Sequence, residues 1–323
     1  MKNNPLKIKV TEDSENHYMK AIKIDDFTTL YEFDFEGSGN GQMICYEVFP
    51  GISLSKIDVN GFHLDNFKRI NQNREITINH CRKGRFECNF YGKYQYLEEG
   101  DLVAVTKSAH EKYSGFPLGY YEGIEIFIDM EIAKNSLNNI LGYSFDLEEL
   151  YSKISDNENI ILIKATKEID HIFSEMYNVS EKIKSMYFKL KILELFLFLE
   201  IQPLDYKLEN RPQLSKKQVD IVKKVQNEIV QNINEPITLE YLSNKYNIGI
   251  TSLKNSFKTV YGKPLFAWRK DYRLQIAKNL LKESDMAIGD IALKVGYNNS
   301  SKFTAAFKQY YNITPSEYRL NQK

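Results

Sequence analysis

Near the C-terminal end of the chain, apolar residues recur with helical spacing on both sides of a glycine. This pattern predicts one helix, a tight turn at Gly296, where the backbone needs a positive φ, and a second helix. The residues of the second helix that point away from its apolar face are small, polar or basic. The apolar positions that define the pattern are Ile288, Ile291, Val295, Tyr297, Phe303 and Phe307.

The same pattern occurs 49 residues earlier in the chain. The two copies differ by one residue in the turn. Core helices can mimic a single helix-turn-helix pattern, but two copies in register indicate a repeated unit. The apolar positions of the earlier copy are Leu239, Leu242, Tyr246, Ile248, Leu253 and Phe257.

A helix is predicted between the two copies, from Pro264 to about Lys282, because proline favours the first turn of a helix. A helix of this length spans roughly 28 Å. That is close to one turn of a DNA duplex, about 34 Å. A spacer of this kind is suited to placing two helices in consecutive major grooves.

The first half of the chain has a different pattern. Apolar and polar residues alternate in short runs separated by turn signals, which predicts an antiparallel barrel or double-sheet roll. Residues 1–40 are predicted to be irregular, and residues 37–42 to form a loop. The predicted strands include Glu75–Cys81, Arg85–Phe90, Tyr94–Tyr96, Leu102–Thr106 and Gly123–Met130.

Helical spacing returns at Ile161–Tyr177 and at Glu181–Glu200. The second of these helices has a broad apolar stripe that is predicted to pack on the barrel. Its other faces are also apolar, so we expect it to form a dimer contact as well. The stripe contains Met186, Leu190, Leu193, Phe196 and Leu197, and the other apolar positions are Phe188, Ile192, Leu195 and Leu199.

Residues 201–214 contain two prolines and mixed charge, which predicts an interdomain linker. A helix is predicted at Ser215–Asn232, and Thr238 is predicted to cap the first helix of the earlier copy. The length of 323 residues also suggests about two domains.

The net charge of zero conceals an asymmetry. Residues 215–323 carry 18 Lys and Arg against 9 Asp and Glu, a charge of +9, which leaves −9 on residues 1–214. An acidic domain joined to a basic one fits a sensor joined to a nucleic-acid binder, although a solvated basic surface would have the same charge. No apolar run approaches the roughly 20 residues that span a bilayer. The N-terminal residues show no signal-peptide pattern, so a cytoplasmic protein is expected.

The residues that most often carry enzymatic chemistry form no recognisable motif. The chain has three cysteines, Cys45, Cys81 and Cys88, which we expect to be free buried thiols, with a redox pair of the last two as the alternative. His80, Glu87 and His110 are the plausible metal ligands, but Arg82 stands where an H-x-H pair needs its second histidine. No metal or cofactor is therefore expected. An enzyme is disfavoured, since a nucleophile elbow, a phosphate loop and a carboxylate pair are all lacking.

Two segments resemble the DNA-binding domain of the AraC/XylS family of bacterial transcription regulators, over a region from about Gln218 to Arg319. They are DIALKVGYNNSSKFTAAFKQYYNITPSEYR (Asp290–Arg319) and ITLEYLSNKYNIGITSLKNSFKTVYGKPLFAW (Ile237–Trp268). Within that family, SLKNSFKTVYGKPLFAW and GYNNSSKFTAAFK resemble the PchR-like subtype.

The resemblance implies an α+β protein in which a cupin-like β-barrel or jelly roll with a C-terminal helical pair is joined to an all-α domain. That domain contains the two helix-turn-helix units. The expected boundaries are an effector-binding domain at 1–160, a helical dimerisation element at 161–200, a linker at 201–214 and a DNA-binding domain at 215–323.

The resemblance also assigns residues to the DNA interface. Asn255 is expected to pair with adenine, Lys254 or Lys302 with guanine, and Lys258 and Lys308 with phosphate. Some family members carry arginine where this chain has alanine in the second recognition helix, so the first helix is expected to discriminate bases more strongly. The expected contacts are Thr251, Ser252, Lys254, Asn255 and Lys258 in the first helix, and Ser300, Ser301, Lys302, Thr304, Ala305 and Lys308 in the second.

We therefore expect a ligand-responsive regulator, most simply an activator. Its partners would be promoter DNA, RNA polymerase, a small-molecule effector and a second copy of the chain, with no membrane. The alternative is a constitutive DNA-binding protein whose barrel senses nothing. The candidate effector-binding residues are Tyr46, His80, Arg82, Arg85, Phe86 and Tyr94, although for each aromatic residue taken singly an ordinary core position is the favoured interpretation.

Overall fold

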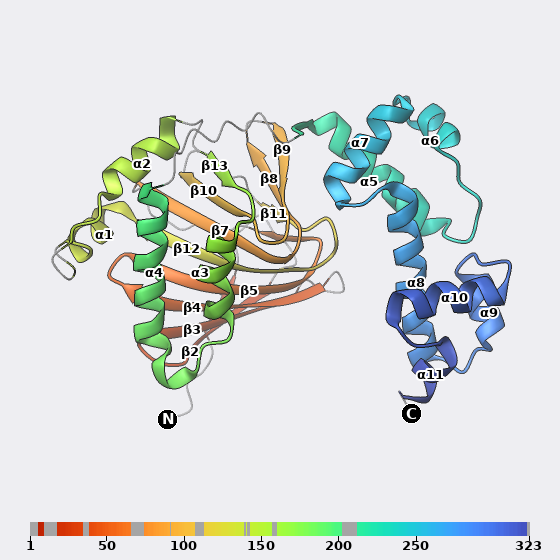
Figure 1. Cartoon of the computed structure of the whole chain (residues 1–323), viewed down its shortest axis with the longest axis horizontal. Coiled ribbons are helices and arrows are strands. Elements are labelled where there is room, and N and C mark those ends of the chain that lie inside the picture. The colour runs from red at the N-terminus through yellow and green to blue at the C-terminus, as the bar shows by residue number, and fades with distance from the viewer. Residues whose placement is uncertain are drawn as a thin grey trace. The chain divides into compact units, whose positions relative to one another are not determined.

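The computed structural model describes residues 6–9, 18–34, 39–65, 74–90, 92–106, 113–138, 140, 143–156, 160–201 and 212–321. The chain divides into two compact units, Met1–Gln213 and Leu214–Lys323. The first combines antiparallel sheets with helices, and the second is helical apart from the two-residue strand β14 (Leu214–Ser215) (Figure 1). In the described part of the chain, no helix has the length and apolar character needed to cross a bilayer.

A large antiparallel sheet organises the first unit. Its side chains alternate between two faces, as the pleat of a strand requires, so that on β7 Ile78 and Cys81 belong to different cores. The nine strands lie in the order β1 (Leu6–Lys9), β2 (Tyr18–Lys23), β3 (Thr28–Asp34), β4 (Gly39–Phe49), β5 (Ile52–Gly61), β12 (Tyr121–Asp129), β7 (Glu75–Gly84), β10 (Leu102–Thr106) and β13 (Ile160–Ile163).

A second, smaller antiparallel sheet faces part of the first. Its Cys88 and Leu97 share a core with Val59 and Val103 of the large sheet, so apolar burial holds the two sheets together. This sheet contains β9 (Lys93–Leu97), β8 (Phe86–Phe90), β11 (Tyr113–Gly115) and β6 (His63–Asp65).

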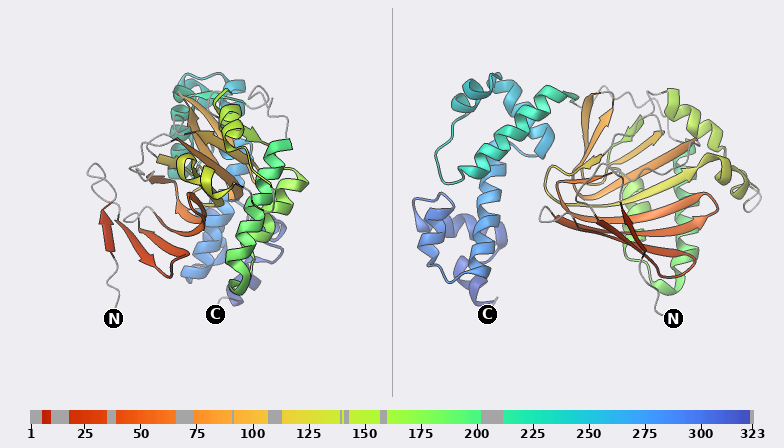
Figure 2. Two further views of the ribbon diagram at one scale, coloured as in Figure 1. Left: turned by 90° about the vertical axis from the view of Figure 1, so that its left-hand side faces the viewer. Right: turned by 180° about the vertical axis from the view of Figure 1, so that it is seen from behind.

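Helices cover the other face of the large sheet. Figures 1 and 2 show α3 and α4 side by side across this face, and a continuous apolar core joins all four helices to the strands. The helices are α1 (Met130–Ser136), α2 (Leu147–Asp156), α3 (Lys167–Tyr177) and α4 (Lys184–Ile201), the last preceded by the 3-10 turn Glu181–Ile183.

The structure reverses the predicted orientation of α4. Most of the predicted packing stripe is exposed, and the residues assigned to its other faces are buried against the sheet. Met186, Leu190 and Leu197 are 61%, 48% and 46% exposed. Of the predicted stripe, only Phe196 is fully buried. The helix is apolar nearly all round, so periodicity alone did not identify its packed face.

Two other predictions from the pattern are wrong. Residues 1–40 are not irregular, because β1, β2 and β3 lie there, and Gly39 to Gln42 of the predicted loop belong to β4. The strands β2 and β3 carry many polar residues, as the Lys20–Glu32 ion pair between them illustrates, and this polarity resembles that of a loop. The predicted helix Ile161–Tyr177 begins as strand β13, because a short buried apolar run looks alike in a helix or a strand. The helices α1 and α2 were not predicted.

Seven helices build the second unit, with one helix-turn-helix unit at each end of α8 (Figure 1). Helix α5 packs on α6 and α7, while α9, α10 and α11 surround the second half of α8. The helices are α5 (Lys216–Gln231), α6 (Leu239–Tyr246), α7 (Ile250–Tyr261), α8 (Leu265–Glu283), α9 (Ile288–Lys294), α10 (Ser300–Tyr311) and α11 (Pro315–Leu320). Most of the predicted linker, residues 202–211, lies outside the described residues.

Candidate DNA interface

The first helix-turn-helix unit contains α6 and α7. Thr238 caps α6 by accepting a hydrogen bond from the Tyr241 amide at 3.1 Å, as its position predicts. The helix ends at Asn247, whose φ of 49° and ψ of 52° are left-handed. The Ile248 amide then returns to the Ser243 carbonyl at 3.1 Å, and α7 begins two residues later. Leu253 and Phe257 are fully buried, so the opposite side of α7 faces outward.

The second unit, α9 and α10, repeats this construction. Gly296 has the predicted positive φ, 84°, and the Tyr297 amide donates to the Ala292 carbonyl at 2.8 Å. Asn299 caps α10 by accepting from the Lys302 amide at 3.0 Å. Phe303 and Phe307 are fully buried. Gly296 and Asn247 occupy equivalent positions in the two turns, and the extra residue of the second helix-turn-helix unit lies between Tyr297 and Phe303.

The outward faces of α7 and α10 carry the residues expected to contact DNA. None of these side chains is buried, and Ser252 and Thr304 are the only two that are partly covered. The full set is Thr251, Ser252, Lys254, Asn255, Lys258, Ser300, Ser301, Lys302, Thr304, Ala305 and Lys308.

The lysines on these two faces are all exposed. Lys254, Lys258, Lys302 and Lys308 form no ion pair within the described part of the chain, whereas Lys245 pairs with Glu228 at 2.6 Å. Unpaired ammonium groups on a convex helix face attract a polyanion without first breaking an internal contact. This arrangement is suited to phosphate binding.

A buried carboxylate positions the first helix-turn-helix unit. The sequence pattern did not identify this carboxylate. Glu228 of α5 is 8% exposed. It accepts hydrogen bonds from the Lys245 ammonium at 2.6 Å and from the hydroxyls of Tyr246 at 2.6 Å and Tyr241 at 2.8 Å. Burial raises the pKa of Glu228, but these three donors outweigh burial and hold the pKa below its usual value of 4.5. Glu228 thereby ties α6 to α5.

In the N-terminal compact unit, Met1–Gln213, three of the six candidate effector residues lie on the helix-covered face of the large sheet. His80 stacks on Phe173 at 4.2 Å, and its Nδ1 lies 3.3 Å from the Tyr177 hydroxyl. Burial, followed by the charge of Arg82, lowers the pKa of His80 to about 4, so the imidazole is neutral near pH 7. Arg82 stacks on Tyr177 at 4.2 Å. Tyr46 contacts Lys184 at 3.4 Å.

The other three candidates lie elsewhere. Phe86 packs in the core between the two sheets, 5.5 Å from the Tyr121 ring. Arg85 is 7% exposed and donates to Glu98 at 3.2 Å, and Tyr94 is buried on β9. The structure therefore does not gather the six residues into one site.

A row of buried polar residues, which no sequence motif indicated, lies on the face of the large sheet that also carries the core shared with the smaller sheet. Ser55 and Asn79 are 1% and 5% exposed and both pair in register with Glu125 of β12. Ser53 and Thr77 are 7% and 4% exposed and both pair with Phe127. We call Ser53, Ser55, Thr77 and Asn79 the inner polar patch. The signal in the sequence was the polar side chains at alternate positions of two otherwise apolar strands.

Gln95 of the smaller sheet is a further buried polar residue, and it faces the space between the two sheets. It lies on the β9 face that carries Leu97, and its Oε1 is buried with no hydrogen-bond partner among the described residues. Polar groups set among apolar side chains are typical of small-molecule sites.

The described residues contain no cluster of three metal-ligating side chains. His110 lies outside them. His80 and Glu87 lie on different sheets, and Glu87 accepts from the Tyr96 hydroxyl at 2.8 Å. Cys81 and Cys88 are buried thiols that are not joined in a disulfide, and burial raises the pKa of Cys81, which disfavours its reactive thiolate.

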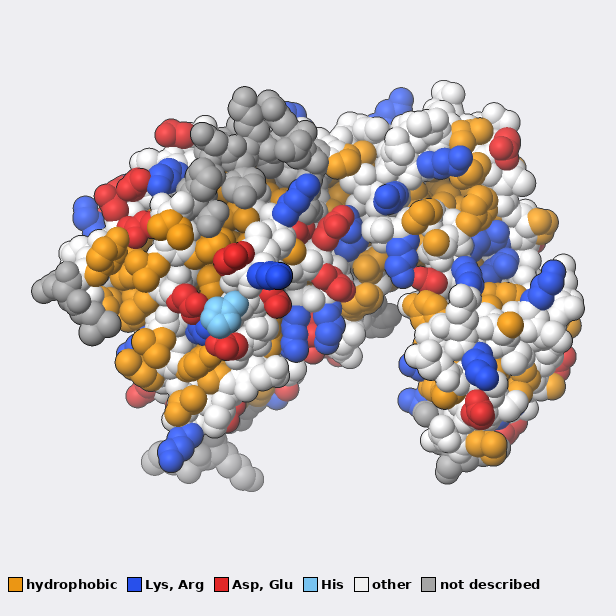
Figure 3. Space-filling view, in the orientation of Figure 1, with side chains coloured by type: hydrophobic (Ala, Val, Ile, Leu, Met, Phe, Trp, Pro, Cys, Tyr) orange, Lys and Arg blue, Asp and Glu red, His pale blue; other side chains and the backbone are white. Residues whose placement is uncertain are grey.

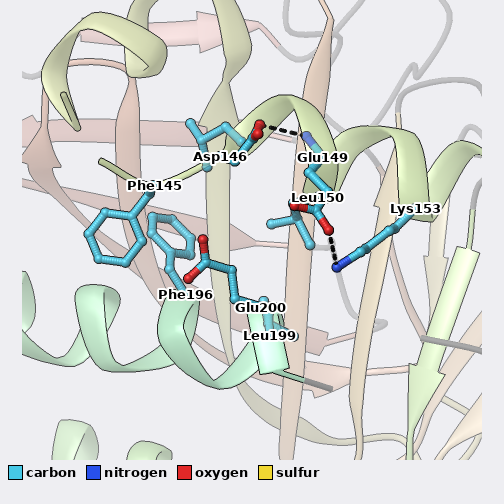
Figure 4. Close-up of a pocket in the computed structure, with 9 residues that line it drawn as sticks. Phe145, Asp146, Glu149, Leu150, Lys153, Phe196, Leu199 and Glu200 are labelled. Atoms are coloured by element: carbon cyan, nitrogen blue, oxygen red, sulfur yellow. Dashed lines mark hydrogen bonds and ion pairs between the residues drawn. The ribbon is translucent and has the colours of Figure 1, made fainter. Parts of the chain in front are cut away.

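A small hollow lies between α2 and the last turns of α4 (Figure 4). Phe145, Leu150 and Leu199 give it apolar walls, and Glu149 and Glu200 make its rim acidic. None of the six candidate effector residues lines it.

The second unit contains a segment that matches a known protein family. A family model described as a helix-turn-helix domain matches residues 242–321. The chain is 37% identical over 81 residues to the HTH-type transcriptional regulator ExsA of Pseudomonas aeruginosa, covering 25% of this chain and 29% of ExsA. It is 30% identical over 115 residues to the virulence regulon transcriptional activator VirF of Yersinia enterocolitica, covering 36% and 39%. The chain thus spans well under half the length of these two relatives.

A shorter relative is covered more completely. The probable transcription factor PqrA of Proteus vulgaris is 34% identical over 102 residues, which are 32% of this chain and 82% of PqrA. Among solved structures, the C-terminal domain of the response regulator yesN from Fusobacterium nucleatum is 32% identical, covering 31% of this chain and 98% of that domain, with a TM-score of 0.30. The paired helix-turn-helix units and these matches show that the chain belongs to the AraC/XylS family of bacterial transcription regulators.

Proposed function

We propose that this protein binds promoter DNA in a sequence-specific way through α7 and α10 and thereby regulates transcription. The observation that carries the proposal is the pair of exposed polar faces, each on a helix anchored by two buried side chains and each carrying lysines free of ion pairs within the described residues. Two faces of this kind at the ends of one connecting helix match two major grooves on one side of a duplex.

The two helices have different roles in this proposal. Helix α7 presents Lys254 and Asn255, whose side chains make bidentate contacts with guanine and adenine. Helix α10 presents Ala305, which offers only a methyl contact. We therefore assign most base discrimination to α7, and shape fit and phosphate anchoring to α10.

The experiment begins with selection of binding sites from random duplex DNA by the full chain. Mobility-shift titrations on the selected site then compare variants over a range of salt concentrations. Lys254→Gln combined with Asn255→Ala should relax the base preference. Lys308→Gln should weaken binding to all DNA sequences alike, and should reduce the slope of log affinity against log salt concentration by about 1. If the double variant keeps both affinity and preference, α7 does not recognise bases.

We further propose that the first unit, a cupin-like domain, binds a small-molecule effector at the inner polar patch and Gln95. The buried Oε1 of Gln95 has no hydrogen-bond partner among the described residues, which is costly, and a polar ligand would supply one. The effector would act by binding one arrangement of the protein more tightly than another, most simply the one that contacts RNA polymerase and activates transcription.

Thermal-shift screening of the full chain against polar metabolites tests this part of the proposal. A ligand that stabilises the wild-type protein should lose its effect in Asn79→Leu but keep it in Lys83→Gln, an exposed change on the same strand. If no metabolite shifts the transition, the protein is better described as a constitutive DNA binder with a non-sensing barrel.

We also propose a homodimer through the exposed face of α4 and the turn before it. Ile183, Met186, Leu190, Leu197 and Ile201 are 46–78% exposed, and we call them the α4 seam. Their spacings of three, four, seven and four residues are those of a coiled-coil seam. Figure 3 shows hydrophobic side chains gathered over α4 on this surface. A second copy would cover the seam by a two-fold symmetric contact.

A further inference from the structure

Two arginines of α8 do not point toward solvent or toward carboxylates. Arg269 is 7% exposed, and its Nη2 donates to the main-chain carbonyls of Asn232 at 3.3 Å and Ile233 at 3.1 Å, and to that of Glu235. Arg273 lies one turn further along the same face. Both arginines contact the connection between α5 and α6, which leads into the first helix-turn-helix unit.

Arg273 also reaches the second unit. Its Nε and Nη2 donate to the Ile233 carbonyl at 2.9 and 2.6 Å, while its Nη1 donates to the Gly296 carbonyl at 3.1 Å. One planar guanidinium group thus joins the connection that leads into the first helix-turn-helix unit to the turn of the second helix-turn-helix unit. The fixed geometry of its five donors allows it to hold two carbonyls at once.

The turn of the second unit is shaped to admit this contact. A Cβ atom on Gly296 would lie 2.5 Å from Arg273 Nη2 and 2.9 Å from the Cα of Asn234. The absence of a side chain at Gly296 therefore has two uses. It permits the positive φ of the turn, and it lets Arg273 and the α5–α6 connection approach the turn backbone.

The arrangement is electrostatically costly, which argues that it is not incidental. Neither arginine forms an ion pair with a carboxylate of the described residues. Burial, and then the charge of Arg273, lowers the pKa of Arg269 to about 10. A core of apolar residues would join the helices without placing two cations together. What the arginines add is direction, since each hydrogen bond fixes one segment relative to another.

We propose that Arg273, assisted by Arg269, is a positioning residue that makes the two helix-turn-helix units one rigid body. The contact fixes the distance and rotation between α7 and α10, and so sets the separation of the two DNA segments that the protein accepts. This inference rests on the proposed function, but the rigidity itself is measurable without DNA.

The first test measures rigidity in the full chain without DNA. Spin labels are attached through genetically encoded keto amino acids at Glu240 of α6 and Asp290 of α9, both exposed, so that the native cysteines are left intact. Pulsed electron paramagnetic resonance should give one narrow distance distribution for the wild-type protein and a broad one for Arg273→Gln. Lys282→Gln removes the same charge from an exposed position of α8 and should stay narrow.

A narrow distribution in Arg273→Gln overturns the inference, whatever the protein does with DNA. If Arg273→Gln does not fold, Arg273→Lys replaces it, because lysine keeps the charge but does not hold two carbonyls in a planar fork. If Arg273→Gln broadens the distance distribution but the wild-type protein binds no DNA, the rigid pair is supported and the proposed function is refuted. A failure of the inference can therefore be distinguished from a failure of the proposed function.

The second test measures how the separation of the two contacted DNA segments affects affinity. One inserted base pair rotates the second segment by about 35° and moves it by about 3.4 Å. The wild-type protein should lose affinity about tenfold, and Arg273→Gln about threefold or less, from a lower starting affinity. Equal losses in the two proteins would contradict a role for Arg273 in setting the separation.

Discussion

At the scale of single residues, buried and partly buried charged groups join the helices of the second unit in addition to its apolar core. Glu228 collects three donors from α6, and Arg273 joins the two helix-turn-helix units. The sequence pattern predicted the buried anchors Leu253, Phe257, Phe303 and Phe307, because apolar periodicity reports burial directly. It did not predict the charged groups, since a lone Glu or Arg on a helix has the same appearance whether it is solvated or buried.

Glu228→Gln should destabilise the second unit by about 2 kcal/mol at neutral pH, because it replaces charge-assisted hydrogen bonds with weaker ones. The folded pKa of Glu228 lies below its unfolded value of 4.5, so its contribution is complete above that pH and is lost as pH falls through the folded pKa. The difference between wild type and variant should therefore shrink in acid. Urea unfolding followed by the single tryptophan, Trp268, measures it in the helical unit.

Asp220→Asn is the control for Glu228→Gln, since it removes a carboxylate from an exposed position of α5. It should change the free energy of unfolding by less than about 0.5 kcal/mol. A Glu228→Gln protein as stable as this control at every pH would show that the buried carboxylate does not hold α6 in place.

At the scale of elements, the turns of the two helix-turn-helix units show how far a sequence predicts a positive backbone φ. Gly296 was predicted to have a positive φ, and this is confirmed. Asn247 has the same role but was missed, because asparagine also occupies many ordinary turn and cap positions. In the first unit, β13 was predicted as helix because its four apolar residues fit both periods. The packed face of α4 was reversed because nearly every face of that helix is apolar.

The left-handed conformation of Asn247 leads to a matched pair of variants. Asn247→Ala should destabilise the second unit by about 1 kcal/mol, since a Cβ without a local hydrogen-bonding group is strained there. Asn247→Gly should be neutral or slightly stabilising, because glycine adopts this conformation freely. Trp268 fluorescence during urea unfolding measures both, and equal stability of the two variants would show that the conformation is not strained.

At the scale of the whole molecule, the two units present different exposed surfaces. The first exposes the apolar α4 seam, and the second exposes lysines that form no ion pairs in the described chain. The charge asymmetry predicted the basic surface of the second unit, and the excess apolar residues of α4 predicted an exposed apolar face, but on the side of the helix that the structure buries. It did not predict where an effector would bind, because the inner polar patch is assembled from strands distant in sequence and has no motif.

The dimer predicted from the α4 seam is tested by placing a charge in its centre. Leu190→Glu should convert the full chain from dimer to monomer in sedimentation velocity, because a carboxylate in an apolar contact loses its hydration without gaining a partner. Leu293→Glu is the control, since Leu293 is 58% exposed on α9 of the other unit. A Leu190→Glu protein that remains dimeric would place the dimer contact elsewhere.

The central claim is that one chain contacts two consecutive major grooves through α7 and α10. Hydroxyl-radical footprinting of the full chain on a selected duplex tests it most directly. The wild-type protein should protect two patches about 10 base pairs apart on one side of the duplex. Lys254→Gln with Asn255→Ala should weaken the protection at one patch more than at the other. A single protected patch, or equal loss at both, would contradict the claim.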